Sequence, residues 1–421
     1  MKLRFYNAKI LTMESENIIE GELCTDGGGI SYVGAERASS GYDREIDLGG
    51  NLIIPGFKNA HTHSAMTFLR SLADDLTLND WLYKQVFPRE AKLTEEAVYV
   101  YTQLANMEYL TSGITSSFDM YMKLPAYVKA CRDMGYRTVL CGSINDFGGT
   151  VEGIEEEFNT YNNSGELISY QLGFHAEYTT KRETLEGLAE LSRKLKAPLY
   201  AHNSETRAEV EGCRERYGMS PTQLFDRLGM FEYGGGGFHC VWFDERDMEI
   251  FAEKGLWAVT NPASNLKLAS GIAPICEMRR HGMTNFAIGT DGAASNNCLD
   301  MFREMFLVAG LQKFREENAA ACPAFEVLEM ATKGGALAMG LTDCDVLKEG
   351  KRADFAVIDL KQPNMRPLNN IAKNLVYSGS KQNVTMTVVN GQILYENGKF
   401  PTVDSERIYA EAERLTSLFV L

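Results

Sequence analysis

Histidine is rare in this sequence of 421 residues, and the spacing of its six histidines points to metal chemistry. Two of them form His61-Thr62-His63, directly after the apolar run LIIPGFKNA. Side chains on a strand alternate between its two faces, so a spacing of two residues places both imidazoles on one side. Two neutral imidazoles that face one cavity can bind a divalent metal ion. An isolated His-x-His pair is equally compatible with two hydrogen-bonded structural histidines.

Further candidate ligands lie at the ends of other apolar runs. His202 ends the run PLYAH, His239 ends GGFH, and Asp291 ends FAIGTD. The carboxyl ends of the strands of a (β/α)8 barrel face one shared site, where residues far apart in sequence converge. We therefore predict one divalent metal ion, with four ligands: His61, His63, His202 and Asp291. Nitrogen ligands with a carboxylate suit zinc or iron more than magnesium or calcium. Zinc is favoured, and iron is the alternative.

A hydrolytic metal site also needs groups that move protons. Glu205 lies three residues beyond His202, in the sequence HNSE. A carboxylate there could take a proton from water and return it to a leaving group. The same segment could instead begin the next helix. His239 could either join the metal or orient the attacking water, and Asp291 could both bind the metal and accept a proton. We therefore predict Glu205, His239 and Asp291 as the catalytic residues.

The elements that position these residues follow from the order of apolar runs. From residue 56 to about 340, short strand-like runs alternate with longer amphipathic stretches. Examples of the runs are 138–144, 168–176, 197–205, 235–243, 255–263 and 284–292. Expected helices include 182–195, 244–254 and 272–281. A strand-then-helix order repeated over nearly 300 residues indicates a parallel sheet, and this length suits a closed (β/α)8 TIM barrel.

Both ends of the chain have β-type patterns instead. Residues 2–10, 18–25, 29–33 and 45–54 predict strands separated by glycine-rich turns, and the run LIIP leads into the first barrel strand. After residue 347 the strand pattern returns at 353–360 and 385–399, with Asn-Gly turns, before a helical tail from residue 405. We therefore predict a small β-sandwich domain formed by residues 1–55 and 345–421, and a metal-dependent barrel domain over 56–344.

Several long motifs occur together in this sequence: PGFKNAHTHSAMTFLRS, AHNSET, FHC, TNPASNLKLASGIAPI and IGTDGAASNN. The longer of these are specific, whereas His-x-His alone is not. With these motifs the chain resembles the metal-dependent amidohydrolase superfamily and, within it, the 5-methylthioadenosine/S-adenosylhomocysteine deaminase group. The resemblance extends over nearly the whole chain, to KEGKRADFAVIDL and PTVDSE near its end.

The resemblance implies roles for individual residues. His61, His63, His202 and Asp291 match its four metal ligands, and His239 matches a histidine that positions the hydrolytic water. Glu205 matches a carboxylate that transfers protons and contacts the purine ring. The resemblance also implies residues that bind the substrate, and Glu205 is one of them. Glu90, in FPREAKLTEE, matches a glutamate that contacts the ribose, and His175, in GFHAEYT, matches a histidine that contacts the substrate. Asp291 belongs to the substrate-binding set as well.

The activity that the resemblance implies is hydrolytic deamination of an adenine nucleoside to an inosine-type product and ammonia. Its substrate would be 5-methylthioadenosine, S-adenosylhomocysteine, 5'-deoxyadenosine or adenosine. Family members that bind the homocysteine tail use arginines after the third strand, but no arginine lies between Arg137 and Arg182. A neutral 5'-substituent is therefore favoured. Glu177 replaces a proline that is usual in the family, and adds a negative charge near the pocket or at its rim. The alternative is an aminohydrolase or chlorohydrolase of guanine, a pterin or a triazine.

Composition limits the partners of the protein. Lys and Arg total 42 against 57 Asp and Glu, which gives a formal net charge of −15. A field of this sign repels phosphates and argues against nucleic acid or an anionic membrane as partners. No apolar window is long enough to cross a membrane, and nine cysteines without a CxxC pair indicate reduced thiols. We therefore expect a cytoplasmic enzyme with a small-molecule substrate. The oligomeric state is left open, with a homo-oligomer as one option.

Overall fold

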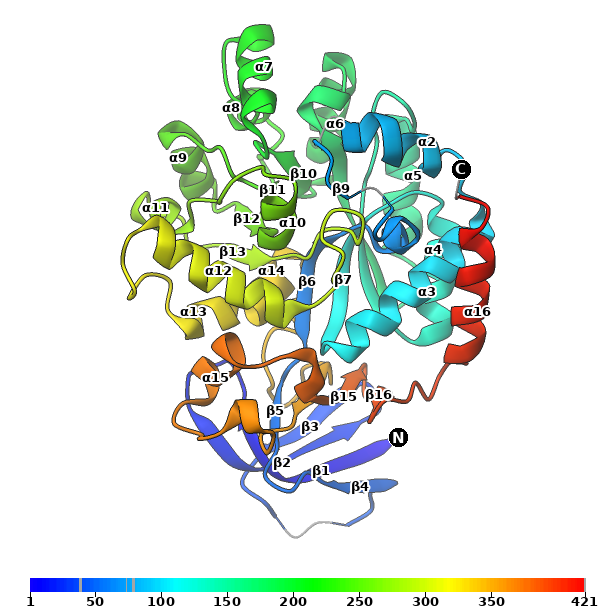
Figure 1. Ribbon diagram of the computed structural model, residues 1–421, viewed down its shortest axis with the longest axis vertical. Coiled ribbons are helices and arrows are strands. Elements are labelled where there is room, and N and C mark those ends of the chain that lie inside the picture. Colours follow the sequence, from blue (N-terminus) through cyan, green and yellow to red (C-terminus); the bar gives the residue numbers. More distant parts are fainter. Residues whose placement is uncertain (38–39, 73, 78–79, 420–421) are drawn as a thin grey trace.

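The computed structural model describes residues 1–37, 40–72, 74–77 and 80–419. Eight parallel strands form the sheet in its upper part (Figure 1), and each pairs with the next along the chain. The last strand returns to the first, where Asp291 N donates to His61 O at 3.0 Å. The strands are β6 (Phe57–Thr62), β7 (Ile114–Met120), β8 (Arg137–Cys141), β9 (Ile168–Ala176), β10 (Leu199–Asn203), β11 (Gly235–His239), β12 (Trp257–Thr260) and β13 (Phe286–Ile288). The predicted (β/α)8 barrel is confirmed.

Helices surround the barrel, and their bounds follow local capping chemistry. The helix predicted at 182–195 is α6, and that predicted at 244–254 starts one residue later because Asp244 is its N-cap, in a capping box with Asp247. The helices are α2 (Phe87–Glu90), α3 (Glu95–Thr111), α4 (Leu124–Met134), α5 (Val151–Tyr161), α6 (Arg182–Leu195), α7 (Arg207–Tyr217), α8 (Pro221–Arg227), α9 (Glu245–Lys254), α10 (Pro262–Lys267), α11 (Ile275–Arg280), α12 (Met301–Arg315), α13 (Ala324–Glu329), α14 (Gly335–Ala338), α15 (Ile371–Tyr377) and α16 (Ser405–Thr416). None of these described helices is long and apolar enough to span a bilayer.

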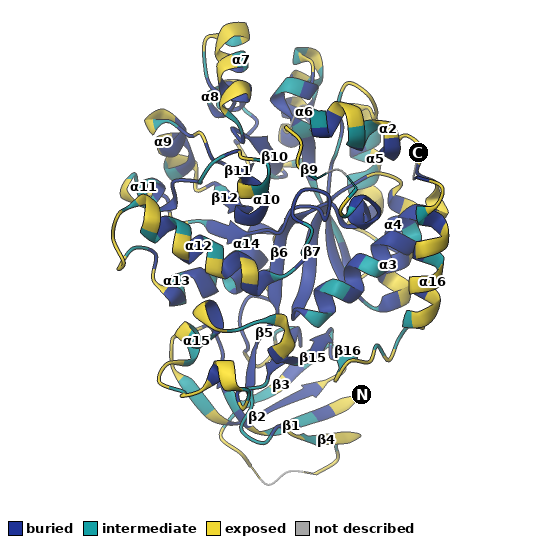
Figure 2. Ribbon diagram, viewed as in Figure 1, coloured by how far each residue is buried: buried dark blue, intermediate teal, exposed yellow. Residues whose placement is uncertain are grey.

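The barrel interior is an apolar floor beneath the predicted site. The barrel strands are buried almost throughout (Figure 2), which explains their near-continuous apolar sequences. Phe238 on β11 packs edge-on against Phe118 on β7, with 5.6 Å between ring centroids. The ring of His61 stacks on the same Phe238 at 3.9 Å. The first metal-ligand candidate therefore rests directly on the packed core.

The two ends of the chain meet in a second sheet, as predicted. Its order is β16-β15-β14-β5-β1-β2-β3, with β4 paired to β1. The N-terminal and C-terminal parts join where β14 pairs antiparallel with β5, and the rings of Phe5 and Phe355 pack edge-on at 5.0 Å. The strands are β1 (Lys2–Leu11), β2 (Ile18–Asp26), β3 (Gly29–Gly34), β4 (Arg44–Asp47), β5 (Leu52–Pro55), β14 (Phe355–Ile358), β15 (Val384–Val389) and β16 (Gln392–Glu396).

The run LIIP does not lead into the barrel strand, as the sequence pattern suggested. It forms β5 of the small sheet, and the chain turns at Gly56 to begin β6. A Cβ atom at Gly56 would lie 2.1 Å from Thr115 Cγ2, so this close approach requires glycine. A buried ion pair joins the two sheets nearby, with Arg137 Nε on β8 at 2.6 Å from Asp354 Oδ2. This contact fixes the small sheet against the end of the barrel opposite to the predicted site.

Candidate active site

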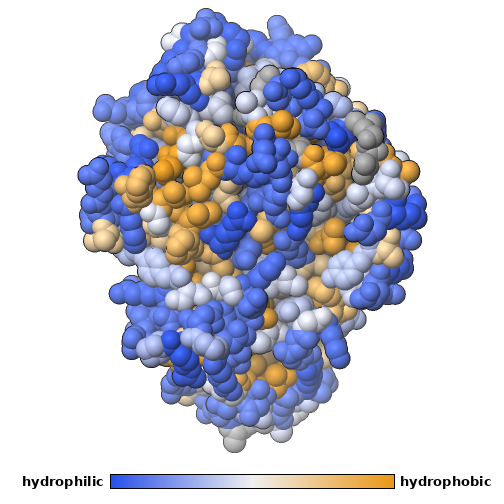
Figure 3. All heavy atoms as spheres, viewed as in Figure 1, coloured by the Kyte–Doolittle hydropathy of each residue, from blue (hydrophilic) through white to orange (hydrophobic). Residues whose placement is uncertain are grey.

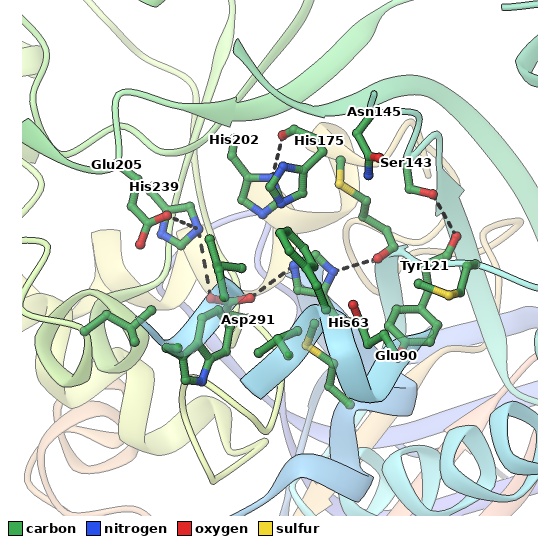
Figure 4. A pocket seen from close by; sticks show the side chains of 18 of the residues that line it. His63, Glu90, Tyr121, Ser143, Asn145, His175, His202, Glu205, His239 and Asp291 are labelled. Atoms are coloured by element: carbon green, nitrogen blue, oxygen red, sulfur yellow. Dashed lines mark hydrogen bonds and ion pairs between the residues drawn. The ribbon is translucent and has the colours of Figure 1, made fainter. Parts of the chain in front are cut away.

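The side chains predicted as metal ligands converge at the carboxyl end of the barrel. His61 is the penultimate residue of β6 and His63 follows that strand. His202 and His239 lie at the ends of β10 and β11, and Asp291 follows β13. Figure 4 shows the labelled members of this set directed toward one space. Two overlapping groups have all their candidate ligand atoms within 4.8 Å of one another: His61, His202 and His239, and His61, His63 and Asp291.

Three of the imidazoles are held in one orientation by oxygen acceptors. His63 Nδ1 lies 2.6 Å from Met120 O, His202 Nδ1 2.7 Å from His175 O, and His239 Nδ1 2.7 Å from Asn265 Oδ1. A carbonyl oxygen only accepts, so in the neutral ring Nδ1 carries the proton and Nε2 keeps its lone pair. This is the arrangement of a metal-binding histidine whose second nitrogen is fixed by a neighbour.

The surroundings of His61 indicate whether the site fits a metal ion. Its ring is fully buried, and neither ring nitrogen has a hydrogen-bond partner among the described residues. Burial, followed by the neighbouring imidazoles, holds the pKa of His61 well below its usual value, so the ring is neutral. A buried polar nitrogen without a partner is costly, and a metal ion among these donors would supply the missing one. The residues present therefore fit one divalent metal.

Asp291 supplies the negative charge of the site. Its Oδ1 lies 3.3 Å from His63 Nε2, and its Oδ2 accepts hydrogen bonds from Ser264 Oγ at 2.6 Å and Ser295 Oγ at 2.8 Å. Burial raises the pKa of this carboxyl, but His63, His239 and the two serines outweigh burial, so the pKa lies below its usual value. Asp291 is therefore ionised at neutral pH.

Glu205 faces His239 across the site. Glu205 Oε2 lies 3.9 Å from His239 Nε2, and Glu205 Oε1 accepts a hydrogen bond from Ser270 Oγ at 2.8 Å. The segment also begins a helix, as its sequence allowed, because Thr206 is the N-cap of α7. Glu209, in the first turn of α7, accepts hydrogen bonds from the backbone N–H groups of Ser204 at 2.9 Å and Glu205 at 2.8 Å. The start of the helix thus fixes where the Glu205 side chain leaves the backbone.

Glu90 and His175, the other two residues predicted to contact substrate, line the same cavity. Glu90, at the end of α2, is buried beside Tyr121 (Figure 4), and burial raises the pKa of its carboxyl to about 7. His175, on β9, lies 2.8 Å from Thr179 Oγ1 through its Nδ1, and burial lowers its pKa to about 4. A neutral imidazole and a titratable carboxyl therefore stand above the metal-ligand candidates.

A second cavity, of about 680 Å³, continues from the site toward the surface, and Glu90 lies where the two meet. Its lining includes the exposed apolar side chains of Tyr83, Met122 and Phe147. Lys123 also lines it. Sequence reasoning sought a cation only between residues 137 and 182 and missed this lysine, which precedes α4 and carries no motif. We refer to this cavity as the outer chamber.

Glu177 does not contribute charge to either cavity. Its side chain is buried, and Oε2 lies 2.5 Å from Arg216 Nη2 on α7. The arginine compensates the carboxylate, and neither cavity lining includes Glu177. The departure from the usual proline therefore anchors α7 rather than changing the pocket.

A barrel with imidazoles and an ionised carboxylate at its carboxyl-terminal face defines a metal-dependent hydrolase. The chain belongs to the amidohydrolase family, which it matches over residues 52–394. It is 38% identical over 424 residues to a 5-methylthioadenosine/S-adenosylhomocysteine deaminase of Caldicellulosiruptor saccharolyticus, covering 99% of both chains. It is 37% identical over 417 residues to a 5'-deoxyadenosine deaminase of Methanosarcina mazei, covering 97% of this chain and 96% of the relative.

A solved structure agrees with these relatives. The crystal structure of an adenosine deaminase from Xanthomonas campestris with bound zinc superposes with a TM-score of 0.94 at 31% identity. The match covers 99% of this chain and 98% of that one, so both sheets share the fold. Family, fold and donor set together identify a hydrolase of C–N bonds that uses a divalent metal.

Proposed function

We propose that this protein is a zinc-dependent deaminase of 5'-substituted adenosines, which produces an inosine-type nucleoside and ammonia. The observation that carries the proposal is one cavity lined by three of the metal-ligand candidates (His63, His202 and Asp291), by the Glu205–His239 pair and by Glu90 and His175. A nucleoside deaminase needs a metal to activate water, groups that transfer protons, and groups that bind the sugar of the substrate. The three sets of residues in this cavity can supply these functions in that order. The full-length similarity to deaminases of adenine nucleosides supports the same substrate class.

In this proposal His61, His63, His202 and Asp291 hold the metal. Zinc suits three imidazoles and one carboxylate, and a related adenosine deaminase contains zinc. When bound, the ion lowers the pKa of a water molecule towards neutrality and so makes it nucleophilic near pH 7. The chain itself contributes the orientation of each imidazole, through the oxygen atoms that accept from Nδ1.

Protons move through Glu205 in this proposal. Water supplies the oxygen that replaces the amine, and its two protons end on a purine ring nitrogen and on the departing ammonia. Glu205 takes a proton from the water and delivers it to the substrate, since Ser270 holds one of its oxygen atoms and leaves the other facing the site. His239 and Asp291, 4.0 Å apart, stand where they orient the water for attack. Glu90 and His175 hold the nucleoside.

The outer chamber accounts for the substituent at the 5' position. Glu90 lies at its junction with the inner cavity, so a ribose held there directs its 5' carbon outward. Aromatic and thioether side chains line the chamber and suit a neutral apolar substituent such as methylthio or a 5'-deoxy group. Lys123 and Glu157 line it too, but Lys123 is exposed to solvent, where an ion pair with the carboxylate of a zwitterionic tail contributes little. The test compares kcat/KM of zinc-loaded protein for 5-methylthioadenosine, 5'-deoxyadenosine and S-adenosylhomocysteine. We expect at least tenfold preference for the two neutral substrates, and equal or higher kcat/KM for the third would contradict it.

A further inference from the structure

Trp242 lies outside the candidate site but is tied to it at two points. It is the third residue after β11, its side chain is 39% exposed, and it lines neither the inner cavity nor the outer chamber. Its backbone N–H donates to Ser204 O at 2.8 Å, and its indole Nε1 donates to Ser270 O at 2.8 Å. Ser204 directly precedes Glu205, and Ser270 Oγ donates to the Glu205 carboxylate. Trp242 therefore contacts both the chain that carries Glu205 and the serine that holds its side chain.

These four residues form a closed ring of contacts. Ser204 is covalently joined to Glu205, Glu205 Oε1 accepts from Ser270 Oγ at 2.8 Å, and Ser270 O accepts from the indole of Trp242. The backbone N–H of Trp242 closes the ring at Ser204 O. A closed ring restrains a side chain more than one hydrogen bond does, because no member moves without disturbing another. Loss of the indole N–H would open the ring between Trp242 and Ser270.

The backbone around this ring adopts conformations that need such support. Ser204, Cys240 and Ala269 have φ values of 53°, 51° and 54°, in the left-handed region, although none of them is glycine. Residues in this region persist where surrounding contacts fix them. Gly271 has a φ of 130°, and a Cβ atom there would lie 2.8 Å from Val241 Cγ1. The loop after α10 and the segment after β11 are therefore fitted closely at the point where the indole N–H joins them.

Apolar burial does not account for a tryptophan at this exposed position. The guanidinium of Arg207, on α7, lies 5.3 Å from the centre of the Trp242 ring. Figure 3 shows mostly hydrophilic side chains over α7, at the top of the molecule. A phenylalanine ring could make the same contact with an arginine. What distinguishes tryptophan is its ring N–H, which only donates, and here it donates to Ser270 O.

We propose that Trp242 is a positioning residue for the deamination, whose indole N–H fixes the loop of Ser270 and, through it, the carboxylate of Glu205. The inference rests on the proposed function, because Trp242 acts only through the proton carrier assigned there. With Ser270 in place, Glu205 Oε1 is occupied and Oε2 lies 3.9 Å from His239 Nε2, facing the site. A displacement of about 1 Å in such a group can lower the rate about 10²-fold.

Trp242→Phe tests the indole N–H, because phenylalanine keeps an aromatic ring and lacks the donor. The assay uses zinc-loaded protein and whichever substrate of the nucleoside panel turns over fastest. We expect kcat to fall about tenfold or more, with KM and metal content changed by less than about twofold. A role in stability alone would lower the temperature of unfolding but leave kcat per zinc-loaded site unchanged. Trp257→Phe is the matched control, since Trp257 begins β12 at the opposite end of the barrel, and its kcat should equal that of the wild type.

A double-mutant cycle tests whether Trp242 acts through Ser270. Ser270→Ala removes the hydroxyl that holds Glu205 and should itself lower kcat. Because both substitutions open the same ring, adding Trp242→Phe to Ser270→Ala should lower kcat by less than about twofold further. Losses that multiply in the double variant, or a kcat of Trp242→Phe equal to that of the wild type, overturn the proposal.

Hydrogen exchange of backbone amides tests the same contact without a substrate. The amides of residues 268–271 should exchange about fivefold faster or more in Trp242→Phe than in the wild type, because the loop has lost a hydrogen bond that fixes it. Trp257→Phe should exchange there like the wild type. Absence of turnover by the wild type would overturn the proposed function, whereas unchanged exchange at 268–271 in Trp242→Phe would overturn the role of Trp242.

Discussion

At the scale of single residues, neighbouring groups of the candidate site carry different charges near pH 7. Asp291 is ionised since imidazoles and serine hydroxyls outweigh its burial, while His61 is neutral since burial and neighbouring imidazoles oppose a charge there. Burial lowers the pKa of His239, but the carboxylates of Glu205 and Asp291 outweigh it and raise that pKa above its usual value. A water molecule among these groups would meet both an acceptor and a donor of protons.

Replacement of the proposed proton carrier separates chemistry from metal binding. Glu205→Gln keeps the hydrogen bond from Ser270 and the shape of the site but cannot accept a proton. We expect kcat to fall by about 10²–10⁴-fold, with unchanged metal content by elemental analysis. His202→Ala is the matched comparison, because it should lower metal content itself. Turnover near the wild-type value in Glu205→Gln would remove Glu205 from its role.

Glu90 predicts a pH dependence of substrate binding. Because burial raises its pKa to about 7, the carboxyl is protonated below that pH and ionised above it. Only the ionised form offers both oxygens as acceptors to ribose hydroxyls. We therefore expect KM for an adenine nucleoside to fall as the pH rises from about 6 to about 8. In Glu90→Gln this change should disappear while KM stays high, and a variant with the wild-type pH profile would contradict the assignment.

At the scale of elements, the start of α7 positions the proposed proton carrier. Glu209 accepts the N–H groups of Ser204 and Glu205, and burial raises its pKa to about 7. Glu209→Ala should lower kcat by about tenfold or more, since a small displacement of a catalytic group is costly, and should leave metal content unchanged. Glu209→Gln keeps one acceptor and should recover part of the loss. Equal kcat in the wild type and Glu209→Ala would contradict this role.

The sequence predicted that side chains at the ends of several barrel strands would converge, and in the structure they do. His202 and His239 each close an apolar run, and in a parallel barrel such ends must face one side, so their convergence followed from topology alone. Ser264, Ser270 and Ser295 were not predicted as partners of the carboxylates. They lie in the motifs TNPASNLKLASG and TDGAASNN. Ser264 is on the short helix α10, and Ser270 and Ser295 are in loops, so none belongs to a segment long enough for its periodicity to assign a direction to the side chain.

The boundary between the two sheets shows a second limit of sequence patterns. LIIPGFKNA reads as one apolar run because both of its strands are buried, so hydropathy cannot reveal that β5 and β6 belong to different sheets. The signal that could have divided them is Pro55-Gly56, a pair of residues that often marks a turn. The tight contact of Gly56 with Thr115 becomes visible only in three dimensions.

At the scale of the whole molecule, a buried ion pair links the barrel to the small sheet. Arg137 and Asp354 are almost inaccessible to solvent, and the pair lies between β8 and the start of β14. Arg137→Met leaves the carboxylate without its closest cation and should lower the free energy of unfolding by about 3–5 kcal/mol. Urea unfolding measures this. Arg414→Met, which breaks the exposed pair between α16 and Glu96 on α3, should change it by less than about 1 kcal/mol. Similar losses in both variants would contradict the buried pair's role.

The contacts that stabilise the barrel against the small sheet and the residues of the candidate site lie at opposite ends of the barrel. The small sheet and its ion pair lie at the amino-terminal end of the barrel strands, whereas the imidazoles, Glu205 and the outer chamber lie at the other. Substitutions in the loops that line the two cavities therefore leave the packed core largely unchanged.

Ammonia release by zinc-loaded protein tests the central claim most directly. The substrates are 5-methylthioadenosine, 5'-deoxyadenosine and adenosine, with guanine and a chlorinated triazine assayed beside them. Our account predicts turnover of the adenine nucleosides, one ammonia for each inosine-type product, and loss of both products in Glu205→Gln. Inertness on every adenine nucleoside, with turnover of guanine or of the triazine, would contradict it.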